Sequence, residues 1–439
     1  MIRQTVFGFK IEKTKEELTA HAGLALLAEY NHGLGLRELV DRHLPAPGSN
    51  RGYQPSAFVD SLVLMLQGGG RRLEDVRELR QERPLLRLVE RNDIPDPDTI
   101  GDWLRRMGDP KNNQAGLVGL GEVRDRVNQR ILRRDARPDY TLDMDAMQVE
   151  AEKVEARFTY QGEKGYMPML GFLFEPALCL VDEFREGNES PAAGHVAFYR
   201  GCKERMPNGK RIARVRTDSA SYQAEFINEL EEDKVLWTIT AGQDEAVRGL
   251  IRTMPLEAWK EPRKGCGYEL AEAVHTMNKT KASFRLVIKR ELRRQQDLFA
   301  GAEGTYHHHA VATNWPDEDK DAQAVLSWHN QRGQAENYNK ELKDGFGQDQ
   351  MPCSESYANA VYFRIGVLAY NLFIGFKRLS CLGNWAHHTM STFRWKLVQI
   401  AGRIVHHAGR VILKLAVGKE KFELWERIRA GCYEISLAP

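Results

Sequence analysis

The 439-residue sequence has little that indicates a secreted, membrane-embedded or nucleotide-hydrolysing protein. Its six cysteines lie far apart and form no CxxC pair, so the sequence predicts neither a cysteine zinc site nor a disulfide framework. The opening residues, MIRQTVFGFKIEKTKEE, contain no apolar signal segment, and no apolar run reaches the length of a membrane span. No glycine-rich run ends in the Gly-Lys-Ser/Thr of a nucleotide-binding loop. We therefore expect a cytoplasmic protein with free thiols and no membrane partner.

The charges are nearly balanced over the whole chain but are unevenly distributed along it. The 63 lysines and arginines exceed the 61 acids by only two, so the total charge does not indicate a nucleic-acid ligand. From Phe376 to Ala430, however, eleven lysines and arginines are accompanied by only three glutamates. A DNA-binding surface needs a local basic excess of this kind, although a solvated helix face gives the same pattern.

Residues 1–130 carry the pattern of several short helices. Apolar residues recur at helical spacing in 21–44 and in 55–67, and turn sequences such as the Pro-Asp-Pro-Asp run at 95–98 separate the segments. Short helices joined by tight turns are typical of a helix-turn-helix-like DNA-binding region. The alternative is a helical cap with a purely structural role.

The pattern changes to a period of two within the next segment, residues 131–240. Strands are expected at 140–150, 166–175, 178–184, 211–217 and 235–240, with helices over 191–202 and 221–231. The resulting order, βββαβαβ, is that of the ribonuclease H fold. We therefore predict an α+β or α/β protein with a ribonuclease H-like core.

The rest of the chain divides into three further segments. Residues 241–322 contain strand-like pieces and predict a β-rich insertion in the core. Residues 323–375 return to helix and are expected to complete the core, and residues 376–439 form a basic region expected to be helical. The core is thus predicted to lie between helical regions at both ends of the chain.

The run WHNQRGQAENYNKELKDGFG carries an unusual set of side chains at helical spacing. Trp328, Arg332, Glu336 and Lys343 fall within an arc of about 80° if the run is one helix. A tryptophan, two cations and a carboxylate on one stripe do not make a hydrophobic core face. The combination suits a metal-binding acid flanked by phosphate contacts.

Two upstream segments offer partner carboxylates for Glu336. Asp143 and Asp145 alternate with Leu142 and Met144 along the first predicted strand, so both acids lie on the same face. Asp218, in Arg-Thr-Asp-Ser, stands where another strand ends. Carboxylates at strand ends together with one on a helix are suited to hold two hard cations such as Mg²⁺.

These residues resemble DDE transposases of bacterial insertion sequences, of the IS4-like superfamily and most closely of the IS1380 family. The resemblance covers about 140–375 and rests on the motifs LDMDA, GEKGYMPML, REGNES, RTDS and RGQAENYNKELKDGFG. IS4-like enzymes place the third acid in a Tyr, Arg, Glu, Lys signature. Arg332, Glu336 and Lys343 match its spacing, whereas the tyrosine position falls on His329, with Trp328 beside it.

Carried over to this sequence, the resemblance implies a catalytic, metal-binding triad of Asp145, Asp218 and Glu336, with Asp143 as the alternative first acid. The implied cofactor is Mg²⁺ or Mn²⁺, as two ions. Arg332 and Lys343 would contact the DNA backbone, and His329 or Trp328 would take the place of the tyrosine. Trp237 and Trp315 are candidates to stack on an unpaired base, although tryptophans in β-rich regions commonly lie in the core.

The resemblance further implies a transposase that binds terminal inverted repeats and target DNA, and that cleaves and joins DNA by a cut-and-paste route. A synapse of two DNA ends implies a homodimer when DNA is bound. One alternative is a nuclease of the same fold that cuts without strand transfer. Another is a DNA-binding regulator with an inactive core, which the three acids argue against because carboxylates near a polyanion weaken binding.

Overall fold

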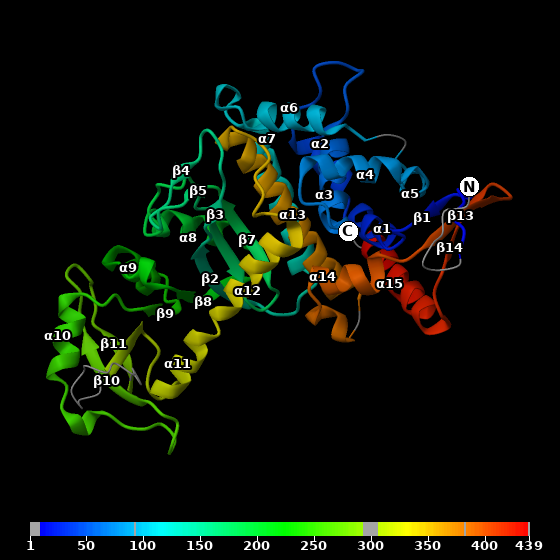
Figure 1. The fold of residues 1–439 in the computed structure, drawn as a ribbon. Coiled ribbons are helices and arrows are strands. Elements are labelled where there is room, and N and C mark those ends of the chain that lie inside the picture. The colour runs from blue at the N-terminus through cyan, green and yellow to red at the C-terminus, as the bar shows by residue number, and fades with distance from the viewer. Residues whose placement is uncertain (1–8, 92–93, 293–305, 382, 438–439) are drawn as a thin grey trace.

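A computed structural model describes residues 9–91, 94–292, 306–381 and 383–437. Figure 1 shows a large mixed β-sheet on one side of the molecule and a helical body, formed by both ends of the chain, on the other. The predicted α+β character is therefore confirmed.

The large sheet has eight strands in the order β10-β11-β12-β9-β8-β2-β6-β7. These are β2 (Asp139–Ala146), β6 (Met169–Leu173), β7 (Leu178–Glu183), β8 (Arg211–Thr217), β9 (Leu236–Thr240), β10 (Glu269–His275), β11 (Phe284–Leu292) and β12 (Tyr306–Thr313). The strands β2, β8 and β9 run parallel to one another, and every other pairing in the sheet is antiparallel. The helices α8 (His195–Glu204) and α9 (Ala224–Glu232) make the crossover connections that parallel strands require.

The central strands are buried on both faces. Along β2, Thr141 to Met144 are all buried, and along β9 so are Trp237 to Ile239. Near-continuous burial is typical of strands covered on both faces. This environment means that a charged side chain within these strands must have a partner or a function.

The helical body contains α1 (Leu24–Gly33), α2 (Leu36–His43), α3 (Pro55–Gly68), α4 (Val76–Gln81), α5 (Arg83–Leu88), α6 (Pro97–Gly108) and α7 (Ala115–Leu132). At its centre lies α13 (Ser356–Leu379), which packs against α3, α6, α7 and strand β7. A Cβ atom at Gly375 would stand 2.2 Å from the Tyr30 hydroxyl oxygen, so α1 packs directly on the backbone of α13. By length and composition α13 is apolar enough to cross a membrane, but 94% of its most apolar window is buried inside the protein.

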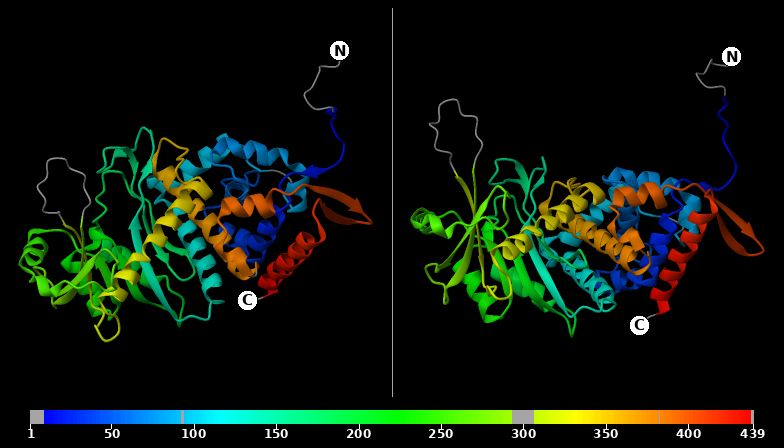
Figure 2. Two further views of the ribbon diagram at one scale, coloured as in Figure 1. Left: turned by 60° about the horizontal axis from the view of Figure 1, so that its bottom comes forward. Right: turned by 90° about the horizontal axis from the view of Figure 1, so that it is seen from below.

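The C-terminal region differs from the helical expectation for 376–439. It contains a β-hairpin, β13 (Gly402–His407) and β14 (Arg410–Leu415), followed by α15 (Lys419–Leu437). The two-residue loop, Ala408-Gly409, has positive φ at both positions (49° and 73°), as the turns favoured in tight hairpins do. The hairpin projects from the helical body (Figure 2) and pairs with β1 (Leu18–Thr19), while α15 packs against α1. Adjacent pairs of β-branched residues in Arg-Ile-Val-His-His and Arg-Val-Ile-Leu-Lys favour strands over helix here.

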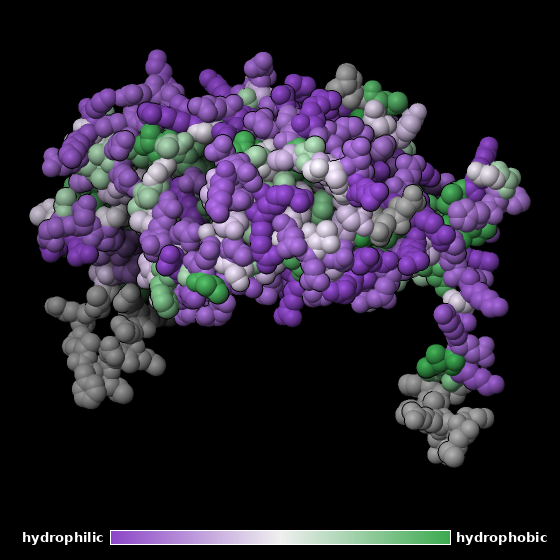
Figure 3. Space-filling view, turned by 90° about the horizontal axis from the view of Figure 1, so that it is seen from above, coloured by the Kyte–Doolittle hydropathy of each residue, from purple (hydrophilic) through white to green (hydrophobic). Residues whose placement is uncertain are grey.

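The strands of the predicted β-rich insertion at 241–322 extend the core sheet. After α10 (Glu245–Thr253), β10 to β12 join the core sheet, because β12 pairs antiparallel with β9. Of the remaining short strands, β3 (Val149–Glu150), β4 (Arg157–Phe158) and β5 (Lys164–Tyr166) form a small sheet of their own. Seen from above, the surface is mostly hydrophilic with small, separated hydrophobic patches (Figure 3).

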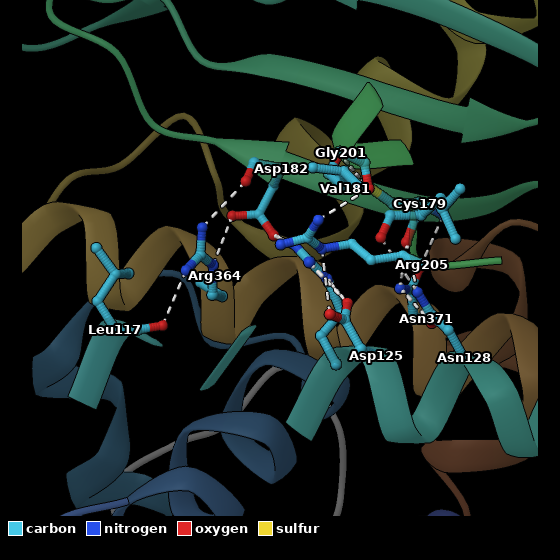
Figure 4. A network of polar contacts seen from close by, with 12 residues as sticks. Leu117, Asp125, Asn128, Cys179, Val181, Asp182, Gly201, Arg205, Arg364 and Asn371 are labelled. Carbon is cyan, nitrogen blue, oxygen red and sulfur yellow. Dashed lines mark hydrogen bonds and ion pairs between the residues drawn. The ribbon is translucent and has the colours of Figure 1, made fainter. Parts of the chain in front are cut away.

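A buried polar network fixes the helical body to the sheet (Figure 4). Asp182 on β7 accepts hydrogen bonds from Arg124 of α7 and from Arg364 of α13, the latter at 2.8 Å. Burial raises the pKa of the Asp182 carboxyl, but the two arginines outweigh it and hold that pKa below its ordinary value. Asn371 and Asn128 bind the Cys179 carbonyl in the same layer. These contacts lock α7 and α13 against the edge of the sheet.

Candidate active site

Two of the predicted acids stand side by side at the ends of neighbouring parallel strands. Met144 and Thr217 are the last residues paired between β2 and β8. Asp145 follows Met144 directly along the chain, and Asp218 follows Thr217 in the same way. Adjacent strands lie about 4.8 Å apart. The chain turns directly after Asp218, whose carboxylate accepts a 3.0 Å hydrogen bond from the Ala220 amide.

Asp145 lies in a strongly acidic environment. Its side chain is 16% exposed, and burial is the main reason that its pKa is raised to about 7. The charges of Asp218 and Glu336 raise the pKa further, whereas Arg332 lowers it. The Arg332 Nη1 atom is 3.9 Å from an Asp145 carboxylate oxygen. Asp145 therefore lies within reach of the charges of both Asp218 and Glu336.

Glu336 enters this site from the helix α12 (Gly333–Lys340), with its side chain exposed. Within the described ranges, no three His, Cys, Asp or Glu side chains are close enough to hold one metal ion. The three acids therefore do not form a complete set of metal ligands in this conformation. The oxygen-only donor set is nevertheless the type that Mg²⁺ and Mn²⁺ prefer.

Asn339 is a member of the site that the sequence analysis missed. Its Nδ2 donates a 3.0 Å hydrogen bond to Asp145, while its own side-chain oxygen is buried and has no partner among the described residues. Asn339 follows Glu336 by three residues, so both lie on the same side of α12. This three-residue spacing from Glu336 is the feature of the sequence that could have identified Asn339 as part of the site.

Asp143 is occupied elsewhere. It lies opposite Arg216 in the β2–β8 register, both side chains are fully buried, and two hydrogen bonds of 2.8 and 2.9 Å join them. The Arg216 guanidinium also stacks on the Phe174 ring at 4.2 Å. The two acids on the same face of β2 thus have different environments, one paired with a cation and one open to the acidic site.

The segment around residue 330 is two helices rather than one. The first, α11 (Ala322–Asn330), ends before a tight turn at 331–332, and α12 is followed by the π-helical turn η5 (Glu341–Gly345). Arg216 donates a 3.0 Å hydrogen bond to the Trp328 carbonyl, beside this turn. Trp328 and Lys343 therefore do not share a regular helical face with Glu336, contrary to the single-stripe prediction.

Comparison with known proteins decides the family. The family model "Transposase DDE domain group 1" matches residues 8–428, which is nearly the whole chain. The chain belongs to this family of DDE transposases. No curated protein matches the sequence. A solved structure titled "Cryo-EM structure of piggyBac transposase synaptic complex with hairpin DNA" is similar at a TM-score of 0.43 and 9% identity, covering 95% of this chain and 81% of the other.

The match confirms the DDE transposase prediction, whereas the assignment to the IS1380 family stays a prediction. DDE transposases generally use divalent metal ions, so the acids of this transposase are the residues to consider as ligands.

The residues predicted to contact DNA lie in contrasting environments. His329 is 3% exposed, and both its ring nitrogens lie within hydrogen-bond distance of hydroxyls of Thr238 and Thr240 on β9. Burial, followed by the charge of Arg332, lowers the His329 pKa to about 3. In this transposase the ring thus holds α11 against the sheet and offers no nitrogen to DNA.

The three tryptophans also differ. Trp237 is fully buried and donates a 2.8 Å hydrogen bond to Glu231. It is therefore a core residue and is not placed to stack on a base. Trp315 and Trp328 are partly exposed and contact each other with ring centroids 5.6 Å apart. Lys343 is partly exposed and forms no ion pair with any residue that the structure describes. Trp315, Trp328 and Lys343 thus remain accessible, although not on one stripe.

Proposed function

We propose that the protein is the DDE transposase of a bacterial insertion sequence of the IS1380 family, within the IS4-like superfamily. In this proposal it acts in the cytoplasm, binds terminal inverted repeats, and carries out metal-dependent cleavage and strand transfer as a dimer that holds two DNA ends. The main observation behind the proposal is that Asp145 and Asp218 lie next to each other at the ends of neighbouring strands, and that the charge of Glu336 helps to raise the Asp145 pKa.

The sheet supports a ribonuclease H-like core as part of this proposal. In order of appearance the core strands are β2, β6, β7, β8 and β9, and in space they lie β7-β6-β2-β8-β9. The first three pair antiparallel, and β8 and β9 add in parallel on the other side of β2. This agrees with the βββαβαβ order predicted from the sequence.

Asp145, Asp218 and Glu336 are the residues that would hold Mg²⁺ or Mn²⁺. Burial, together with the like charges of Asp218, Glu336 and Asp143, raises the Asp145 pKa to about 7, and a divalent cation would offset that repulsion. Bound there, such ions activate the attacking oxygen and stabilise the leaving oxygen of a phosphodiester.

The protein's own residues perform the positioning. Asn339 holds the Asp145 carboxylate by the 3.0 Å hydrogen bond and limits its rotation. Arg332, close to the same carboxylate, is placed to neutralise a DNA phosphate, since its planar guanidinium suits two phosphate oxygens. Lys343, which forms no ion pair within the described ranges, would add a second positive charge toward the DNA backbone. Asp143 and Arg216 fix the strand on which Asp145 stands.

Cleavage and joining of DNA carrying the element's terminal inverted repeats test the proposal. The wild-type protein is incubated with a labelled duplex that spans one repeat and its flank, in Mg²⁺, in Mn²⁺ and in a chelator. We expect cleavage at the repeat boundary only with metal, followed by transfer of the freed 3′ end into a target plasmid. Cleavage without transfer would favour the nuclease alternative, and binding without cleavage in either metal would favour the regulator.

A further inference from the structure

A basic pocket lies between α2 and α7, away from the acidic site. It is a cavity of about 320 Å³ whose polar lining comes from Arg42, His43, Arg126, Gln129, Arg130 and Arg133. Three of these residues lie on α7 and Arg133 is its C-cap; their spacing of i, i+3, i+4 and i+7 places them in one stripe along the helix. A Cβ at Gly119 would stand 2.3 Å from the His43 carbonyl oxygen. This close approach brings the end of α2, with its two basic side chains, against that stripe.

The positive charges of this pocket are not balanced within the protein. Within the described part of the chain, none of its four arginines forms an ion pair with a carboxylate. Burial, together with the charges of Arg134, Arg42 and Arg133, lowers the pKa of Arg130, and the charge of Glu38 opposes this effect. The cations therefore repel one another, which costs stability unless an anion binds.

The neighbouring Arg124, also on α7, provides the contrast. It is 2% exposed and paired with both Asp182 and Asp125. The buried arginine of α7 is thus neutralised by carboxylates of the protein itself, as expected for a structural role. Arg126 and Arg133, by contrast, have exposed side chains and form no ion pair with any residue that the structure describes, so packing does not explain their presence.

We infer that this arginine pocket binds phosphates of the DNA backbone outside the catalytic site. The inference rests on the proposed function, in which DNA is the substrate. Arginine forks match phosphate oxygens in pairs, and Leu39 is the only apolar residue among those that line the cavity. The pocket is therefore suited to bind the phosphates of a polyanion by charge, and such contacts do not depend on the base sequence.

The position of the pocket separates it from the chemistry. The chain leaves α7 and enters β2 at Asp139, whereas Asp145 stands six residues later, about 20 Å further along the strand. A duplex held at the pocket would therefore be gripped at a distance from the bond that is cut. The pocket would contribute affinity and register, and not the rate of the chemical step.

A double variant, Arg126→Gln with Arg133→Gln, tests the inference. The matched control is Arg248→Gln with Arg263→Gln, which removes two exposed arginines that lack ion pairs from the 241–322 segment. Binding to a terminal-repeat duplex and to an unrelated duplex is followed by fluorescence anisotropy over a range of salt concentrations. Thermal unfolding of each variant verifies that it is folded.

For the pocket variant we expect Kd to rise about tenfold or more on both duplexes, because backbone contacts carry no sequence information. The slope of log K against log salt should become shallower by about 0.9 for each phosphate that the variant no longer neutralises. Single-turnover cleavage at saturating DNA should stay within a few-fold of wild type. A pocket variant that is folded and matches the control in Kd and slope would overturn the inference. Wild-type protein that neither binds nor cleaves the repeat duplex would instead refute the proposed function itself.

Discussion

At the scale of single residues, the clearest result concerns two acids that the sequence does not distinguish. Alternation along β2 places Asp143 and Asp145 on the same face, and the sequence analysis left both as candidates. The structure separates them through a partner 73 residues away from Asp143, since Arg216 forms a buried ion pair with that residue. Strand alternation is a local pattern and was predictable, whereas the choice of ion-pair partner depends on which strands become neighbours.

Asp143→Ala and Asp145→Asn should therefore fail in different ways. Removing Asp143 leaves Arg216 buried without a counter-charge, so the free energy of unfolding should fall by about 3–5 kcal/mol. Asp145→Asn should abolish metal-dependent cleavage while stability is kept or raised, because the variant loses a buried carboxylate repelled by its neighbours. Chemical denaturation and DNA cleavage measure the two effects. Loss of cleavage in Asp143→Ala with undiminished stability would show that Asp143 is the first catalytic acid.

Lys377 provides a prediction for pH dependence away from the site. It lies on α13, 7% exposed, and donates a 2.8 Å hydrogen bond to the His388 carbonyl. Burial lowers its pKa to about 8, below the value near 10.4 expected in the unfolded chain. Between these pH values the unfolded chain binds more protons, so Lys377 makes the free energy of unfolding rise with pH.

Lys377→Met should lack this rise. Thermal unfolding is measured from pH 7 to 10.5 for wild type, for Lys377→Met and for Lys421→Met, a control at an exposed position on α15. The difference in stability between wild type and Lys377→Met should change by up to about 3 kcal/mol across the window, with wild type gaining as pH rises. A constant difference, like that of the control, would contradict the buried position of this lysine.

At the scale of elements, the sequence predicted the core strands better than their surroundings. The predicted strand positions match β2, β6, β7, β8 and β9, because short runs rich in apolar and β-branched residues, bounded by turn residues, leave a strong local signal. The break between α11 and α12 was not predictable, since it involves the hydrogen bond from the distant Arg216 to the Trp328 carbonyl. The hairpin of β13 and β14 was missed even though its turn and β-branched residues were visible.

The strands β10 to β12 illustrate why an insertion need not be a separate unit. Leu286 and Ile288 of β11 face the main core, whereas Val287 between them packs in a second small core with Val325 and Leu326 of α11. Alternate residues of one strand thus depend on two different partners outside 241–322. The segment shares its sheet with the core rather than closing on itself.

Residues 241–322 produced alone should therefore not fold cooperatively. The fragment lacks β9, which pairs with its edge strand β12, and the apolar residues of α11 that cover one of its faces. We expect circular dichroism to show no sigmoidal thermal transition, whereas the whole chain shows one. A cooperative transition in the isolated fragment would mean that it is an independent domain.

At the scale of the whole molecule, the two ends of the chain build one helical body around α13. The sequence analysis treated residues 1–130 and 376–439 as separate regions, but α1 packs with α15 and β1 pairs with β13. Contacts between residues about 400 positions apart have no counterpart in local patterns. The arginine pocket between α2 and α7 belongs to this body, whereas the acids lie on the sheet side of α13. The molecule thus presents a basic binding surface and an acidic reaction site on different parts of one fold.

The central claim is that Asp145, Asp218 and Glu336 form one metal-dependent site for DNA cleavage. Its most direct test is single-turnover cleavage of a terminal-repeat duplex by wild type, Asp218→Asn and Glu336→Gln at saturating DNA, with Mg²⁺ or with a chelator. We expect wild type to cleave only with Mg²⁺. Each variant should bind DNA within a few-fold of wild type but cleave at least about 10²-fold more slowly, the loss seen when a group that stabilises transition-state charge is removed. Cleavage by wild type in the chelator, or near wild-type rates in either variant, would contradict the claim.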